Sequence, residues 1–511
     1  MSNLKNLYFF NNFFIFFPII PIFLKPKVTT NRLYTLIWLK FTIKIGNRGQ
    51  IMQLPKIIYT ISTKLTEHNA KAIVVGGSVR DHFLQLPIKD YDVEVYGLES
   101  IEDLEKILAQ YGSVNLVGKS FGVLKFQYDS EEYDFSFPRT EQKTGTGHRG
   151  FDVSVDGAMS FKEASKRRDF TLNAMGYDIE EECFLDPYHG RRDMKKKLLC
   201  HIDDETFIED PLRVYRAIQF SARFDYALAE DTFELCRSMV VNGMLEELAQ
   251  ERIYVEFKKL FLKSPKPSIG FELMRELDIL SYFPELKAII DVPQSPQWHP
   301  EGDVWIHTLM AVDAMVALLG SDEKQNLRYL FAILCHDFGK ATHTTIEEDG
   351  RIRAIGHEEA GVEPTKSFLY RLTNEHDFIA SILPLVEHHL KPSQFYAGKS
   401  KDKAFRKLAT KVNIEELVVV AEADFLGRTT EASLAGVYLA GKWMLERAKN
   451  LKVDNRPLVN LLQGRDLIAL GLEPSTKFKE MLEAIYNLQL EGFLSEKEDA
   501  LEYIRVNYME Y

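Results

Sequence analysis

The feature that most constrains this chain is a short apolar segment followed by a Gly-Gly pair and then by two aspartates. Residues 72–75 are apolar and run into Gly76 and Gly77, after which a helical pattern begins. Asp90 and Asp92 open a stretch in which residue types alternate as they do in a strand. Because successive side chains of a strand point to opposite faces, both carboxylates are expected on one face.

This arrangement predicts a metal-dependent nucleotide site. Two neighbouring carboxylates repel each other unless a divalent cation lies between them, and ligation by oxygen alone suits magnesium. The Gly-Gly turn lets the backbone approach a phosphate closely, and the start of the helix offers N–H groups to bind it. Arg80 lies just inside this helix, where its guanidinium can donate two hydrogen bonds to a phosphate. The alternative is a surface turn followed by an acidic strand edge.

The composition indicates an ordinary globular protein. With 511 residues, the chain is long enough for two to four domains. A net charge of −12 argues against a uniformly basic surface but not against a local basic patch that holds nucleic acid. The four cysteines are scattered without a C-x-x-C pair, which indicates reduced thiols and excludes a zinc site built on sulfur.

The first 51 residues differ from the rest. Residues 7–24 are dense in Phe and Ile, but Asn and Pro interrupt them, so a spanning helix here would be short and twice broken. No small-residue cleavage site follows, and the segment is not rich in Arg. Our interpretation is a mistaken upstream start with Met52 as the true initiator; the alternative is a membrane anchor or a targeting segment. The first interpretation predicts a cytoplasmic protein without stable membrane association.

The periodicity divides the chain into a mixed head and several helical blocks. Strand-like and helix-like patterns alternate at first, as in an α/β unit, and the later patterns are nearly all helical. Proline-rich breaks separate the helical blocks. The expected parts are an atypical extension at 1–51, a head at 52–190, a helical neck at 191–263, a helical linker region at 264–300, a second helical domain at 301–440 and a helical tail at 441–511.

Two further segments connect the head to a known family. Residues 166–174 read Lys-Arg-Arg-Asp-Phe-Thr-Leu-Asn-Ala, and residues 209–216 read Glu-Asp-Pro-Leu-Arg-Val-Tyr-Arg. Together with the Gly-Gly and Asp-Tyr-Asp segments, they resemble the motif series of the tRNA nucleotidyltransferases that add CCA, a family similar to the bacterial poly(A) polymerases. The resemblance covers 72 to about 223. It implies an α+β nucleotidyltransferase head of the polymerase-β type followed by an all-α neck.

The resemblance also implies roles for individual residues. Asp90 and Asp92 would be the catalytic pair that binds magnesium, with one ion activating the attacking hydroxyl and another steadying the triphosphate. The nucleotide's phosphates or ribose would contact Gly77, Arg80, Arg168 and Asp169.

Base choice is assigned by the resemblance to Asp210 and Arg213, which lie three apart and hence on one helical face. A carboxylate accepts from the exocyclic amine that cytosine and adenine share, and a guanidinium donates to ring acceptors, so CTP and ATP are the expected substrates. Arg216 would support the triphosphate. The family's pattern has an arginine where this chain has Gln219, and a neutral amide cannot replace a guanidinium's charge.

Two features of the head stay open. Asp134 lies on an expected strand and is either a third metal-site carboxylate or a strand-surface charge. A Gly- and Thr-rich segment at 141–155 resembles the flexible loop that helps the family pass from C addition to A addition. Its presence favours complete CCA addition over CC-only or A-only products.

The second helical domain carries another set of metal-ligand residue types. His307, His336-Asp337 and Asp424 resemble the ligand set of the HD phosphohydrolase superfamily, which implies an all-α HD domain. His357 and either His388 or His389 lie where some HD proteins place further ligands. Imidazole with carboxylate suits a divalent transition metal such as manganese, nickel, iron or zinc, and a metal-bound hydroxide would attack a phosphate ester. The alternative for any single histidine is a core residue.

The expected macromolecular partner is a tRNA 3′ end. Candidate phosphate contacts are the basic segments at 166–168, 191–192 and 195–197, for which the alternative is a solvated helix face. Two other functions remain open. One is a poly(A) polymerase, although those typically carry a basic C-terminal region. The other is an HD phosphohydrolase or RNA-binding protein with an impaired head, which Gln219 favours.

Overall fold

The computed structural model of the protein describes residues 51–117, 123–143, 151–155 and 159–509. The chain forms two compact units, at 1–53 and 54–511, and the description below concerns the second. Within it the predicted fold class is confirmed: a mixed head with a β-sheet is followed by a helical region and a helical second domain. The bounds of the individual parts remain predictions.

The head is built on a seven-stranded sheet with the order β3-β4-β5-β2-β1-β8-β9. All neighbours pair antiparallel except β2 and β5, which are parallel, and this central parallel pair aligns Asp92 with Asp134. The strands are β1 (Lys71–Val75), β2 (Tyr91–Tyr96), β3 (Ser113–Val117), β4 (Val123–Tyr128), β5 (Glu131–Ser136), β8 (Gly176–Asp178) and β9 (Cys183–Leu185). A separate antiparallel pair consists of β6 (Arg139–Lys143) and β7 (Phe151–Val155).

Helices cover this sheet because each presents an apolar stripe to it. Helix α2 (Lys56–Glu67) buries isoleucines and Leu65 against β1, and α4 (Ile101–Leu108) packs against α2 and β3. The Ser100 side chain caps α4 by accepting a hydrogen bond from the Asp103 N–H, at 3.2 Å. Helix α3 (Gly77–Phe83) starts directly after β1, and α5 (Phe161–Lys166) begins with a capping box.

The neck is almost wholly helical. Its long helices α8 (Leu212–Phe224) and α10 (Gln250–Lys263) pack against each other, and α11 (Ser268–Glu276) packs on α8. The pattern placed the start of α8 at Asp210-Pro211; the helix begins at Leu212 because Pro211 itself occupies the N-cap position. The other elements are η1 (Thr171–Asn173), α6 (Gly190–Lys196), β10 (Leu198–Leu199), α7 (Asp204–Ile208), β11 (Ala227–Leu228), α9 (Glu230–Val241), η2 (Met244–Glu247), η3 (Ile279–Tyr282) and α12 (Pro284–Lys287).

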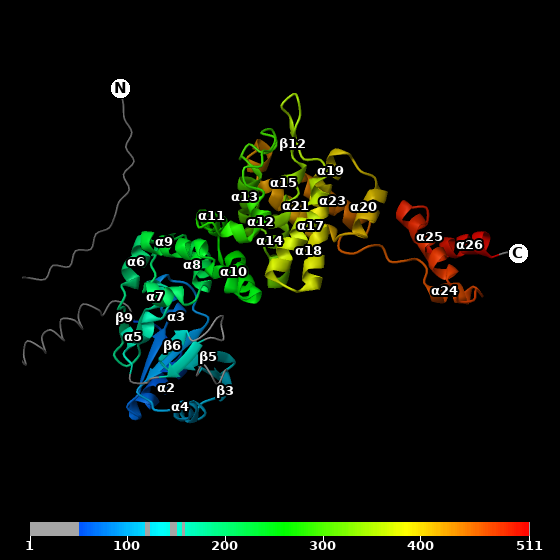
Figure 1. Ribbon diagram of the computed structural model, residues 1–511. Coiled ribbons are helices and arrows are strands. Elements are labelled where there is room, and N and C mark those ends of the chain that lie inside the picture. Colours follow the sequence, from blue (N-terminus) through cyan, green and yellow to red (C-terminus); the bar gives the residue numbers. More distant parts are fainter. Residues whose placement is uncertain (1–50, 118–122, 144–150, 156–158, 510–511) are drawn as a thin grey trace, which may run out of the picture. The chain divides into compact units, whose positions relative to one another are not determined.

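The second helical domain packs four helices around an apolar core. Helix α13 (Val304–Val316) contacts α14 (Glu323–Cys335) and α21 (Ile414–Leu426), and α18 (His376–His388) contacts α14. Figure 1 shows α14, α17 and α18 side by side. The remaining elements are α15 (Lys340–His343), β12 (Thr345–Ile346), β13 (Ile352–Arg353), α16 (His357–Ala360), α17 (Val362–Leu372), α19 (Lys391–Ala397), α20 (Asp402–Ala409), α22 (Glu431–Leu434) and α23 (Leu439–Asn450).

The tail has a small apolar core of its own. It consists of α24 (Gly464–Ala469), α25 (Lys477–Glu491) and α26 (Lys497–Tyr508), and α25 contacts α20. Six residues form the buried part of this core: Leu462, Leu467, Met481, Ile485, Ala500 and Ile504. Among the helices that the structure describes, none combines the length and the apolar character needed to cross a bilayer.

Helices α13 and α21 approach each other most closely at a glycine. A Cβ added to Gly427 would lie 2.6 Å from Cα and 2.8 Å from Cβ of Ala311. Both distances are shorter than real carbon contacts, and the Ala311 backbone cannot rotate away as a flexible side chain can. The glycine therefore sets the separation of the two helices, which carry His307 and Asp424.

We predict that Gly427→Ala lowers the free energy of unfolding of the second helical domain by about 1–3 kcal/mol, the usual cost of overpacking. Thermal unfolding of the variant measures the effect. Gly320→Ala is the matched control because no atom lies within 4 Å of its added Cβ. Equal stability of the two variants would contradict the close approach.

Candidate active sites

The turn after β1 requires glycine at Gly76. Its φ is +70°, a left-handed conformation that L-residues rarely adopt. An added Cβ would lie 2.8 Å from Nη1 of Arg168 and 3.7 Å from a carboxylate oxygen of Asp92. The missing side chain thus lets an arginine and a carboxylate meet over the turn, and Gly77 begins α3 directly after it.

Three aspartates form what we call the carboxylate site: Asp90, Asp92 and Asp134. Asp92 and Asp134 are register partners on parallel strands, so their side chains share one face of the sheet, as the alternation predicts for Asp90 and Asp92. The side chain of Asp92 reaches solvent, yet its pKa is raised by partial burial and by the charges of Asp134 and Asp90, against the opposing charge of Arg168. The pKa of Asp134 is also raised, by burial and by nearby carboxylates.

These raised pKa values show that negative charge is crowded on this face of the sheet. A divalent cation would relieve the crowding, so the donor set fits magnesium. In the described part of the chain, no three carboxylates of the head bring their oxygens within 4.8 Å of one another. The register favours Asp134 as a neighbour of the predicted pair rather than as a remote surface charge.

Arg168 lies beside the carboxylate site and is paired within the fold. Its Nη2 donates to Oε1 of Glu94 at 2.7 Å, and Arg167 contacts the same oxygen at 3.4 Å. Burial alone would raise the pKa of Glu94, but the two guanidinium groups hold it below its usual value. These arginines are therefore part of a buried ion-pair cluster rather than of a solvated basic turn.

The other predicted phosphate and ribose residues meet in one polar network. Arg80 is 6% exposed, and its Nη1 donates to Oδ1 of Asn173 at 2.8 Å. The Asn173 amide donates to Oδ1 of Asp169 at 2.9 Å, and Arg216 Nε donates to Oδ2 of Asp169 at 2.7 Å. Burial raises the pKa of Asp169, but Arg216 brings it below its usual value. Asn173 was not predicted as a site residue, although it lies within the recognised 166–174 segment.

The predicted base-reading pair lies at the start of α8. Nη2 of Arg213 donates to the backbone carbonyl of Arg167 at 2.5 Å, so the guanidinium is held against the head's arginine segment. Asp210 accepts hydrogen bonds from Nη2 of Arg252 at 3.0 and 3.1 Å. Sequence reasoning missed Arg252, which lies on α10 far along the chain and belongs to no recognised motif.

Gln219 occupies a buried position on α8. It is 2% exposed, and its amide nitrogen has no hydrogen-bond partner within the described residues. The departure from the family's pattern therefore concerns an interior position of the neck.

The basic segments expected to contact RNA have different surroundings. Arg167 and Arg168 are paired with Glu94, as above. On α6, Arg191 lies over the Phe83 ring at 4.6 Å, whereas four basic residues are exposed: Arg192, Lys195, Lys196 and Lys197. The surface of α6 thus remains a candidate for contact with phosphates.

The second candidate site, which we call the histidine site, gathers six buried side chains. Its members are His307, His336, Asp337, His357, His389 and Asp424, each at most 5% exposed. Nε2 of His307 lies 3.1 Å from Asp424 and 3.3 Å from Nε2 of His336. The four residues predicted from the sequence are thus brought together.

The same site extends to a second group of ligand atoms. Oδ1 of Asp337 lies 3.1 Å from Nε2 of His357 and 3.8 Å from Nε2 of His389, while its Oδ2 lies 3.2 Å from His336. Asp337 therefore joins two clusters that could each hold a cation. The structure also decides between the two adjacent histidines, because His388 contacts Glu387 instead.

Backbone carbonyls fix the orientation of three of the rings. Nδ1–H of His336 donates to the Ile333 carbonyl at 2.6 Å, and His357 and His389 make the same bond three residues back, at 2.6 and 2.7 Å. Each ring thus presents Nε2 to the centre of the site. Burial, together with the neighbouring rings, lowers the pKa of His389 to about 3, so its Nε2 carries a lone pair at neutral pH.

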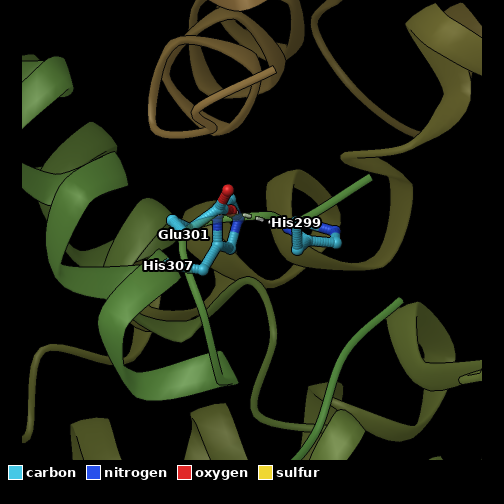
Figure 2. Close-up of side chains that lie close together, drawn as sticks. All are labelled: His299, Glu301 and His307. Carbon is cyan, nitrogen blue, oxygen red and sulfur yellow. Dashed lines mark hydrogen bonds and ion pairs between the residues drawn. The ribbon is translucent and has the colours of Figure 1, made fainter. Parts of the chain in front are cut away.

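The fourth ring is oriented by a side chain, as Figure 2 shows. Nδ1–H of His307 donates to Oε1 of Glu301 at 2.8 Å, and His299 donates to the same oxygen at 2.9 Å. The other oxygen of Glu301 accepts from the Thr429 N–H at 3.0 Å. Burial would raise the pKa of Glu301, but these donors hold it well below its usual value. Sequence reasoning missed Glu301 and His299, which lie in the proline-rich break before α13.

A cavity of about 210 Å³ opens on the histidine site. Lys340 lines it and donates from Nζ to Oδ2 of Asp337 at 2.6 Å, while Arg428 contacts Asp424 at 2.7 Å. Arg353 and Trp298, which is 58% exposed, also line the cavity. Cationic side chains beside a potential metal site suit an anionic ligand such as a phosphate ester.

Comparison with known proteins agrees with the division into these sites. Residues 72–200 match the poly A polymerase head domain, 225–290 match the "Probable RNA and SrmB- binding site of polymerase A", and 304–428 match the HD domain. The chain joins a poly A polymerase head to an HD domain. The carboxylate site lies in the first of these segments and the histidine site in the last.

Solved structures show the same fold over most of the chain. The Bacillus stearothermophilus CCA-adding enzyme in complex with CTP is 20% identical, with a TM-score of 0.59 and coverage of 89% of this chain and 99% of that one. The Thermotoga maritima CCA-adding enzyme complexed with tRNA_CCA is also 20% identical, with a TM-score of 0.55 and coverage of 89% and 96%. A CCA-adding enzyme with ATP gives 20% identity, 0.57, and 90% and 96%. The poly A polymerase head and HD domain are thus arranged in a chain with the fold of the CCA-adding enzymes.

We predict that magnesium stabilises the head through the carboxylate site. A raised folded-state pKa of Asp92 means that the metal-free protein loses stability as the pH rises through that pKa, and a bound cation offsets the loss. At a concentration about 100 times its Kd, Mg²⁺ would add about 2.7 kcal/mol. Thermal unfolding at neutral pH, with Mg²⁺ or EDTA, should show this gain in the wild type but not in Asp92→Asn. Equal gains would contradict a site at Asp92.

We predict that Glu301→Gln weakens metal binding in the HD domain by about 10- to 100-fold, because an amide cannot accept all the hydrogen bonds that converge on Glu301. Competition with a chromogenic chelator measures the affinity without relying on activity. Glu359→Gln, at an exposed position of α16, is the matched control. Unchanged affinity in Glu301→Gln would show that His307 needs no side-chain support.

Proposed function

We propose that the protein is a tRNA nucleotidyltransferase that adds CCA to tRNA 3′ ends from CTP and ATP. The observation that carries the proposal is the convergence, within one polar network, of a carboxylate site with the phosphate and base-reading residues of the recognised motif series. The network joins Arg80, Asp169 and Arg216, and Arg213 contacts the backbone of the arginine segment. The overall likeness to CCA-adding enzymes supports it at the level of fold.

The carboxylate site fits a cation because its aspartates are crowded and their pKa values are raised. Asp90 and Asp92 would hold Mg²⁺, with Asp134 beside them. When bound, Mg²⁺ supplies electrostatic stabilisation for the triphosphate and activates the attacking hydroxyl. The chain's own contribution is to keep the aspartates on one face of a rigid sheet, next to a turn that a phosphate can approach.

Base choice would come from Asp210 and Arg213 at the start of α8. The carboxylate accepts from the exocyclic amine of cytosine or adenine, and the guanidinium donates to the ring acceptors. Uracil and guanine present a carbonyl where these bases carry the amine, so a carboxylate would face another acceptor. Arg216, paired with Asp169, would stay close enough to support the triphosphate.

For the HD domain we propose a metal-dependent phosphohydrolase activity. The histidine site fits a divalent transition metal such as Mn, Ni, Fe or Zn, since it offers four imidazoles and two carboxylates in a buried position. Its two clusters, joined by Asp337, favour a pair of ions. Such ions supply a hydroxide nucleophile, and Lys340 and Arg428 would hold the anionic ester.

A poly(A) polymerase is the second candidate, because the head matches the poly A polymerase head domain. The length of the product separates the two functions. Purified protein is incubated with tRNA lacking CCA, Mg²⁺ and labelled CTP or ATP. We expect three added nucleotides ending in A. A long A tail would favour the polymerase, and no incorporation would overturn both.

We predict that the two activities are lost independently. Asp90→Ala should reduce incorporation into tRNA by at least about 10³-fold and leave hydrolysis of bis(p-nitrophenyl) phosphate unchanged, because it removes a metal ligand of the head alone. His336→Ala should do the reverse and lower the bound transition metal measured by mass spectrometry. Loss of both activities in either variant would contradict separate sites.

A further inference from the structure

Asp210 is held by an arginine from another helix. Nη2 of Arg252, on α10, donates to both carboxylate oxygens of Asp210, at 3.0 and 3.1 Å. The Leu212 N–H donates to one of the same oxygens at 3.3 Å. A carboxylate has about four lone-pair positions, so these contacts fix its direction and leave acceptor capacity for a ligand.

The contact belongs to a regular face of α10 that packs on α8. Arg252 and Glu256 lie one turn apart, and Glu256 is 3% exposed and raises the pKa of Arg216. Tyr215 of α8 and Phe257 of α10 have ring centroids 6.5 Å apart, which ties the two helices together. Thus α10 opposes Arg252 to Asp210 and Glu256 to Arg216, two residues of the proposed nucleotide pocket.

Surface ion pairs generally contribute little to stability. The Arg252 and Asp210 side chains are 31% and 26% exposed, so stability alone gives a weak reason for this pairing. Orientation gives a stronger one, because a carboxylate reads an amine only when its lone pairs point at it. The helix that supplies the arginine also lies in the segment that matches the polymerase's RNA-binding region.

We propose that Arg252 is a positioning residue that aims Asp210 at the exocyclic amine of the incoming nucleotide and thereby sets discrimination against UTP and GTP. This inference rests on the proposed function. It assigns to α10 a part in base choice, beyond the contact with RNA that its family match suggests.

The test compares Arg252→Ala, Arg252→Lys and Arg237→Ala in single-nucleotide incorporation, with CTP, ATP, UTP and GTP assayed separately. Arg237 lies exposed on α9 and provides the matched control. We expect Arg252→Ala to lower the ratio of kcat/KM for CTP over UTP, and for ATP over GTP, by about tenfold, as befits loss of a charged hydrogen bond. Arg252→Lys should recover part of the ratio, and Arg237→Ala should leave it unchanged.

The outcomes separate the inference from the function beneath it. If Arg252→Ala slows all four nucleotides equally, or slows none, its role is structural or absent and the inference is overturned. If the wild type incorporates neither CTP nor ATP, the proposed function itself fails. Should thermal unfolding show that Arg252→Ala does not fold, the ratio in Arg252→Lys decides, and a ratio equal to wild type then overturns the inference unless Asp210→Asn also leaves it unchanged, which overturns base reading by Asp210 instead.

Discussion

Close packing of carboxylate charge on a rigid backbone is the constraint on which both sites depend. In the head, the parallel pairing of β2 and β5 forces Asp92 and Asp134 onto one face, and their pKa values rise as a result. In the HD domain, the end of α14 places Asp337 between two groups of imidazoles. A chain that folded only for stability would avoid both arrangements, because each leaves charge that the surrounding side chains do not fully neutralise.

The arginines of the head and neck show the complementary solution. Glu94 and Asp169 are both buried, and each is paired with guanidinium groups that keep its pKa low. These pairs set the direction of groups that the family uses to contact nucleotides. The arginine network therefore pre-organises the pocket, so less side-chain entropy is lost when an anionic ligand binds.

Much of this architecture could be predicted from the sequence. Local patterns sufficed for the strand with Asp90 and Asp92 and for the His336-Asp337 pair, because period and adjacency are properties of neighbouring residues. Glu301 and Arg252 could not be found in this way. Their partners, His307 and Asp210, lie on other elements, and only the packing of α10 and of the segment before α13 brings them together. The choice of His389 over His388 likewise depends on the direction in which the end of α18 faces.

The backbone bonds of the metal-site histidines have a consequence for how this site can change. His336, His357 and His389 are aimed by main-chain carbonyls, which no amino-acid substitution removes. His307 alone among the four rings is aimed by a side chain, Glu301. Three ligands are thus set by the helical scaffold, and one is adjustable by a single codon. Selection or engineering that retunes metal preference has its simplest handle outside the ligand set, at Glu301.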